Sequence, residues 1–172
     1  MAKVFEAIDS RLQWWIERQH MFFVATAPSG AEGHVNVSPK GPIGSLRILD
    51  PLTVEYDDYV GSGAETGAHL RENGRICLMF CAFEGPPRIV RLHGRGELIA
   101  HDAPSDGGVR GVIRVAIDRV SDACGFGVPL MEVVGERPQR AAWLARHDEG
   151  SLREYMQRKN STSIDGLPAF SA

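Results

Sequence analysis

The sequence predicts a mainly β protein, in which six or seven antiparallel strands form a closed barrel flanked by helices. Short apolar segments separated by turn residues follow one another from about residue 20 to residue 122. A single short helical pattern, at 64–73, interrupts them, whereas a parallel sheet would need a helix between nearly every pair of strands. The other helical patterns lie at the two ends, within 4–18 and 138–172, and we expect residues 1–172 to form one domain.

The N-terminal segment has the spacing of an amphipathic helix, which we expect over residues 4–18. Its apolar positions recur every three or four residues, with charged residues between them: Phe5, Ile8, Leu12, Trp15 and Ile16. The segment MFFVATA, residues 21–27, then predicts a short apolar strand that ends at Pro28.

Residues 34–40, HVNVSPK, alternate between two faces and predict a strand with one side in the core. Val35, Val37 and Pro39 form the apolar face, which we expect to point inward. The polar face would then be open to solvent or to a ligand, and it consists of His34, Asn36, Ser38 and Lys40.

Further strands are predicted where apolar alternation is regular, at 45–50, 52–58, 75–83, 88–100 and 111–125. Gly94 and Gly96 lie on one side of their strand, which indicates a bend or a close packing approach there. Gly74 is a suitable left-handed cap for the helix at 64–73. Two C-terminal helices are predicted at 137–147 and 151–160, the second with Ser151 and Glu154 as a capping box.

Composition excludes several classes of protein. With 19 basic and 22 acidic residues, the net charge of −3 argues against a broad nucleic-acid surface. No apolar run approaches the ~20 residues of a membrane span, and the N-terminus lacks the pattern of a signal peptide, so we expect a cytoplasmic protein. Three cysteines without a CxxC pair, and six histidines without an HExxH motif, predict no metal site.

The stretch YVGSGAETGAHL, residues 59–70, has two interpretations. Ser62 and Glu65 have the spacing of a capping box, which would make the turn a simple helix start. Alternatively, the free N–H groups of that helix start could bind a phosphate, with Gly61 and Gly63 allowing its approach. Lys40 and the face formed by Arg91, His93 and Arg95 could add the positive charge that a dianion requires.

Three segments together resemble one family. In order along the chain they are HVNVSPKG, LTVEYDDYVGSGAETGAHLRENGRICLMF and PPRIVRLHGRGELI. They are similar to the pyridoxamine 5′-phosphate oxidase-like, FMN-binding split-barrel proteins over roughly residues 20–122. The segments VSDACGFGVPLMEVVGERP and KNSTSIDGLPAF resemble a subgroup of small bacterial members. The resemblance implies an FMN-binding split barrel, a homodimer with FMN between the subunits, and flavin-dependent oxidation or reduction of a small molecule.

The resemblance also implies which residues bind the cofactor. Lys40 matches the family's phosphate-binding lysine, whereas Ala64, Glu65 and Thr66 stand where the oxidases carry Ser-Arg-Lys. Two cations are therefore missing, and we expect Lys40, hydroxyl groups and backbone amides to hold the phosphate instead. The predicted FMN-binding residues are Asn36, Val37, Ser38, Lys40, Tyr56, Asp57, Ser62, Gly63, Ala64, Glu65, Thr66 and Arg91. No side chain is assigned as an acid–base catalyst.

A non-enzymatic role on the same barrel is the alternative. The missing Arg-Lys pair would suit a protein that stores or senses FMN, haem or a deazaflavin coenzyme. Haem would need an axial ligand, for which His34, His69 and His93 are the candidates.

Overall fold

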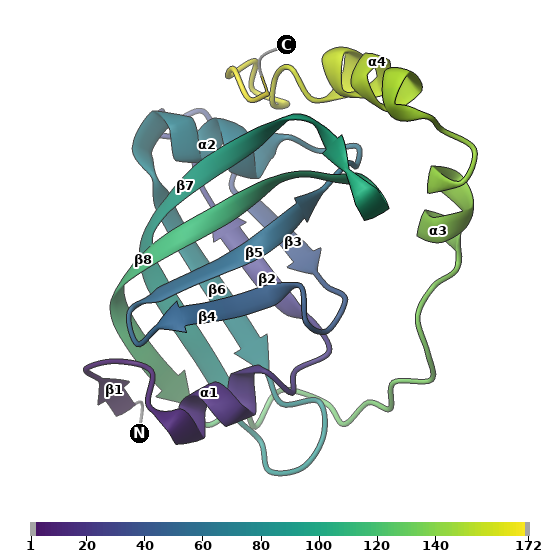
Figure 1. Cartoon of the computed structure of the whole chain (residues 1–172). Coiled ribbons are helices and arrows are strands. Elements are labelled where there is room, and N and C mark those ends of the chain that lie inside the picture. Colours follow the sequence, from purple (N-terminus) through teal and green to yellow (C-terminus); the bar gives the residue numbers. More distant parts are fainter. Residues whose placement is uncertain (1–2, 171–172) are drawn as a thin grey trace.

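An antiparallel sheet coils around one apolar core in the computed structural model, which describes residues 3–170 apart from the side chain of Asp106 (Figure 1). Its strands are hydrogen-bonded in the order β3-β2-β6-β7-β8-β5-β4, and β1 (Lys3–Phe5) pairs with β8. The strand bounds are β2 Phe22–Thr26, β3 Asn36–Lys40, β4 Leu46–Asp50, β5 Thr53–Tyr59, β6 Arg75–Cys81, β7 Ile89–Ser105 and β8 Val109–Ala123. A short 3-10 turn, η1 (Asp106–Gly108), joins β7 to β8. The predicted mainly β, antiparallel architecture is confirmed.

The barrel is split, which confirms what the family resemblance implied and corrects the closed barrel expected from the strand pattern alone. The path of paired strands ends at β3 on one side and at β4 on the other, and within residues 3–170 no ladder joins these two edges. Side chains span the split instead, since Lys40 at the end of β3 forms an ion pair with Asp58 of β5. This edge therefore carries polar side chains where a closed barrel would have backbone hydrogen bonds.

The core fills the inside of the coiled sheet and is closed by a helix at each end. Its fully buried side chains come from five strands: Val24, Val54, Leu78, Leu92 and Ile113. At one end α1 (Ser10–Ile16) adds Leu12 and Ile16, and at the other α2 (Glu65–Asn73) adds Leu70 (Figure 1). Leu70 packs against Gly96, where a Cβ atom would lie 2.8 Å from it, so the close approach predicted at this glycine is confirmed.

The N-terminal helix is shorter than the predicted 4–18. Residues 3–5 pair with β8, and the helix begins only at Ser10 because the carboxylate of Asp9 caps it, accepting a hydrogen bond of 2.7 Å from the Leu12 amide. The prediction that residues 1–172 form one domain remains a prediction, and residues 1–2 and 171–172 lie outside the described residues.

The C-terminal part leaves the barrel and returns to it. Residues 124–137, here called the arm, contain no helix or strand and run below α1, after which α3 (Gln139–Leu144) and α4 (Glu149–Lys159) rise along one side (Figure 1). The two predicted helices are confirmed, but α4 begins earlier than predicted, because Asp148 rather than Ser151 is its cap. Among residues 3–170, no helix has both the length and the apolar character needed to cross a membrane.

Candidate functional site

A polar network lies on the inner side of β3, next to the split in the barrel. The amide nitrogen of Asn36 donates to the hydroxyl oxygens of Thr26 and Thr66, both at 3.1 Å. The Ser38 hydroxyl donates to the Asn36 side-chain oxygen at 2.8 Å, and Thr26 is also 3.0 Å from Nδ1 of His69. These five residues, called the β3 network below, join the edge strand to the start of α2. The structure therefore brings together three predicted site residues, Asn36, Ser38 and Thr66.

The two faces of β3 are the reverse of those predicted. Val35 is 70% exposed and Val37 62% exposed, whereas Asn36, Ser38 and Lys40 are half-buried and point inward. The expectation that the apolar face enters the core is therefore wrong. Hydrogen bonds explain the reversal, because the inner side offers partners from α2 and β5 that a polar face can use and an apolar face cannot.

A buried ion cluster continues the site beyond the β3 network. The carboxylate of Asp58 is 0% exposed and accepts hydrogen bonds from Lys40 Nζ at 2.9 Å and from Arg110 Nε at 2.8 Å. Burial alone would raise the pKa of Asp58, but the charges of Lys40 and Arg110 outweigh it, and the pKa lies below its ordinary value. Two cations share one carboxylate, so this Lys40–Asp58–Arg110 cluster keeps one formal positive charge.

Neither Asp58 nor Arg110 was among the predicted site residues. The pairing of β5 with β8 shifts register between Asp58 and Tyr59, and Arg110 is the extra residue on β8 at that bulge. The bulge turns the Arg110 side chain inward, although the alternation of buried and exposed residues in the rest of β8 would place it outward. A regular alternation pattern therefore could not have identified it.

The C-terminal tail, residues 160–170, covers Arg110. The Phe170 ring lies 4.3 Å from the centre of the guanidinium group and packs against Ala64 and Ala68 at the start of α2. Gly67 makes room for this ring, since a Cβ atom there would lie 3.2 Å from it. Nη1 of Arg110 is buried and has no hydrogen-bond partner among the described residues. The tail thus forms one wall of the site, which the family-like segment KNSTSIDGLPAF did not indicate.

The start of α2 differs from the predicted capping box. Ala64 is the N-cap residue, and no side chain caps it. The carboxylate of Glu65 accepts a hydrogen bond of 3.1 Å from the Ala64 amide, while Ser62 is exposed. Asn160 of the tail donates to the Gly61 carbonyl at 2.8 Å, so the glycine turn is fixed from outside. The predicted Ser62–Glu65 capping box is therefore wrong, because the helix begins at Glu65 with Ala64 as its N-cap.

Two predicted site residues that are neighbours on β5 point to opposite faces of the strand. Tyr56 is fully buried in the core with its ring edge-on to Phe22, and burial together with the nearby Asp58 raises its pKa well above the ordinary value. Asp57 points to the opposite face and forms an ion pair of 2.8 Å with Arg47. Tyr56 therefore lies beside the ion cluster, with Lys40 Nζ 5.9 Å from the centre of its ring, whereas Asp57 lies on the other face of the strand.

Arg91 is also remote from Lys40 within the chain. Registers across β7, β6, β2 and β3 align Arg91 with Met79, Phe23 and Pro39, all on the outer face. Three strand spacings separate it from β3, or roughly 14 Å. Arg91 therefore does not join Lys40 in one chain.

The tail makes a second contact with the barrel just before β3 begins. Asp165 accepts a hydrogen bond from the His34 amide at 2.9 Å and is 2.7 Å from His34 Nδ1. These hydrogen bonds hold the pKa of Asp165 below its ordinary value. Through Asp165, Asn160 and Phe170, the tail therefore contacts both ends of the polar site.

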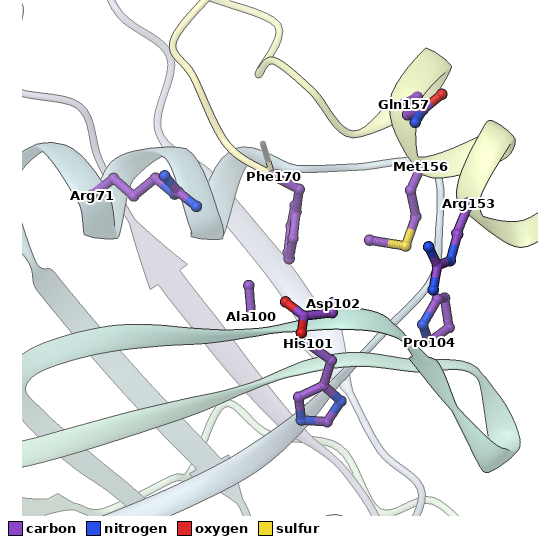
Figure 2. Close-up of a pocket in the computed structure, with 9 residues that line it drawn as sticks. All are labelled: Arg71, Ala100, His101, Asp102, Pro104, Arg153, Met156, Gln157 and Phe170. Carbon is purple, nitrogen blue, oxygen red and sulfur yellow. The ribbon is translucent and has the colours of Figure 1, made fainter. Parts of the chain in front are cut away.

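Between the tail and the barrel lies a cavity of about 500 Å³. Figure 2 shows Arg71 of α2 and Arg153 of α4 on opposite sides, with Phe170 and Met156 between them and His101 below. This cavity is separate from the β3 network, because Phe170 lies between it and the start of α2.

His69 should make stability depend on pH. Burial lowers its pKa below the ordinary 6.5, although Asp165, Glu65 and Glu72 partly oppose this. The unfolded chain therefore takes up a proton that folded His69 resists, so the free energy of unfolding should fall as the pH drops below 6.5. Urea unfolding at a series of pH values should show a shallower fall for His69→Asn, and equal slopes would contradict this assignment.

Comparison with known proteins identifies the family. The model of the pyridoxamine 5′-phosphate oxidase family matches residues 8–124. A curated relative, the pyridoxamine 5′-phosphate oxidase family protein ustO of Aspergillus flavus, is 40% identical over 96% of this chain and 77% of its own length. The chain belongs to the pyridoxamine 5′-phosphate oxidase family.

The similar solved structures are more distant in sequence. An FAD-binding protein from Mesorhizobium loti has a TM-score of 0.49 and 13% identity, covering 71% of this chain and 96% of that one. HutZ, the haem storage protein from Vibrio cholerae, has a TM-score of 0.45 and 11% identity, covering 67% of this chain and 93% of that one.

Proposed function

We propose that this protein binds FMN and is a flavin-dependent oxidoreductase acting on a small molecule. The observation that carries the proposal is the polar inner side of β3 in a chain of this family, where the β3 network and the positive ion cluster adjoin each other. FMN would supply the hydride or electron transfer, and the protein would supply its orientation and electrostatic surroundings.

A single chain offers binding groups for the phosphate end of FMN. Lys40, the Thr66 hydroxyl and the amides of the glycine turn would hold it. Arg110 compensates for the cations missing at Glu65 and Thr66, since it neutralises Asp58 and leaves the charge of Lys40 in excess. Arg110 itself is buried under Phe170, so it acts on the phosphate through Asp58 rather than by direct contact.

A second copy of the chain would complete the site. Val35 and Val37 expose apolar side chains on the outer face of the edge strand β3, which is costly for an isolated subunit. We propose a homodimer that covers this face, with the flavin ring between subunits and Val37 and Arg91 on the same outer surface. Sedimentation velocity should give the mass of a dimer.

The direct experiment is to purify the protein and record its absorbance, then titrate it with FMN. A flavin spectrum, or saturable FMN binding to the purified protein, is expected. If the protein carries no flavin and FMN does not bind in titration, the proposal is wrong.

A non-enzymatic cofactor protein is the second candidate, and one observation favours it. The negative charge of Glu65 lies at the start of α2 and occupies the Ala64 amide, which weakens the site for a phosphate. Haem is the less suitable ligand, because His34 is held by Asp165, His69 is fully buried, and His93 lies on the outer face beside Cys77. Titration with FMN, haem and a deazaflavin coenzyme separates the ligands, and steady NAD(P)H turnover with an acceptor would identify an enzyme.

Glu65→Gln should strengthen FMN binding. The change removes a like charge from the helix start and weakens the hydrogen bond that occupies the Ala64 amide, so we expect an affinity gain of about five- to tenfold, or ~1 kcal/mol. Isothermal titration at low salt measures it. Glu97→Gln, an exposed site on β7, is the matched control and should leave the affinity unchanged.

A further inference from the structure

The arm covers a long cleft that consists of two adjoining cavities. One cavity, of about 570 Å³, lies between α1, the turn joining β6 to β7 and the arm. The other, of about 650 Å³, lies between the end of β3, η1 and α3. His20, Met21, Gly135 and Glu136 line both, so the cavities meet and form one elongated space, here called the arm cleft.

One half of the arm cleft is aromatic and apolar. Its walls include Trp14, Trp15 and Phe83 from the barrel side and Met131 and Val133 from the arm. Trp14 is 56% exposed, although the Arg18 guanidinium lies 3.8 Å from its ring. Flat aromatic walls of this kind favour an apolar, ring-containing ligand body.

The other half is basic. Lys40, Arg137 and Arg140 line it, with Glu136 as the acid at the junction. Arg140 is held in place, since its guanidinium lies 3.5 Å from the Tyr59 ring and donates to the Gly107 carbonyl. Arg137 is exposed and has no ion-pair partner among residues 3–170. A fixed arginine and an unpaired arginine side by side are suited to a carboxylate, sulfonate or phosphate.

Charge also fixes the direction in which such a ligand would lie. The apolar half is lined by Glu84, Glu132 and Glu136 against Arg18, whereas the basic half has three cations against Glu136. An anionic group is therefore repelled from the tryptophan end and attracted to the arginine end.

We propose that the arm cleft binds an amphipathic anion, with its aromatic or apolar body against Trp14 and Met131 and its anionic group at Arg137 and Arg140. Lys40 lies on the wall shared with the proposed flavin site, so the anionic group of a ligand in the cleft would lie near the phosphate end of the flavin. As a binding site the cleft stands independently, and only its position beside the flavin rests on the proposed function.

Two fluorescent probes that differ in charge test the site on protein freed of flavin. 8-Anilino-1-naphthalenesulfonate carries an aromatic body and an anion, and N-phenyl-1-naphthylamine carries the same kind of body without charge. We expect the sulfonate to bind about tenfold more tightly at low salt. Removal of both arginines, in Arg137→Ala/Arg140→Ala, should abolish this difference and leave the uncharged probe unaffected. Trp14→Ala should weaken both probes.

The controls separate a specific site from general apolar binding. Arg119→Ala removes an exposed arginine from β8 and should change neither probe. Arg137→Ala alone tests the site without disturbing the contacts of Arg140 with Tyr59 and Gly107. Equal binding of the two probes, or sulfonate binding that both arginine variants leave unchanged, would overturn the proposal. If the probes behave as expected but FMN does not bind, the cleft stands and only its position beside a flavin is withdrawn.

Discussion

Replacing Asp58 by alanine should lower the free energy of unfolding by about 3–5 kcal/mol, because it leaves two cations in the barrel without their counterion. The carboxylate is fully buried and lies 2.9 Å from Lys40 and 2.8 Å from Arg110. Lys40 can turn toward solvent, but the side chain of Arg110 is only 5% exposed and remains charged. Urea unfolding followed by circular dichroism measures the loss.

The neighbouring residue provides the control for Asp58. Asp57→Ala removes the same group one position earlier on β5, but from the other face, where its partner Arg47 is partly exposed to solvent. Exposed ion pairs contribute little, so this variant should lose less than about 1 kcal/mol. Similar losses for the two variants would mean that the buried cluster has no special role in stability.

Lys40→Ala should weaken FMN binding by about 10- to 100-fold, equivalent to about 1.5–3 kcal/mol. The change lowers the formal charge of the ion cluster from +1 to zero, since Arg110 and Asp58 remain paired. The same pair should keep the variant folded, so the loss of affinity can be separated from a loss of structure. Fluorescence titration of FMN measures the effect.

Two further variants show whether the position of the charge matters. Lys40→Arg should recover part of the affinity because it restores the charge at the end of β3. Lys159→Ala removes an exposed lysine at the end of α4 and should have no effect. If Lys40→Ala binds FMN with unchanged affinity, Lys40 is not part of the FMN site.

Local patterns predicted most of the fold. The strands at 45–50, 52–58 and 75–83 were identified because alternation and turn residues are local properties of the chain, and β4, β5 and β6 occupy those segments. The split, by contrast, depends on which edges fail to pair, and no local pattern contains that information. The length of the first helix was also overestimated, since Phe5 continues the helical spacing but pairs with β8.

The site was predicted only in part, for physical reasons that differ between residues. Alternation divides β3 into two faces but does not indicate which face turns inward. The hydrogen bonds of Asn36 place the polar face inward. Arg110 was missed because a bulge changes its direction. Asn160 and Phe170 were missed because their partners lie far away along the chain, as with Gly61, which precedes Asn160 by 99 residues.

The distance along the chain between the tail and its partners also determines which of them is synthesised first. His34 precedes Asp165 by 131 residues, and every strand of the barrel is made before the tail that contacts the site. Because all the strands are synthesised before the tail, the barrel can form while Arg110 and the glycine turn are still uncovered. A ribosome-bound chain stalled before residue 160 would thus carry an assembled barrel with its polar edge open, and cofactor loading at that stage would precede closure by the tail.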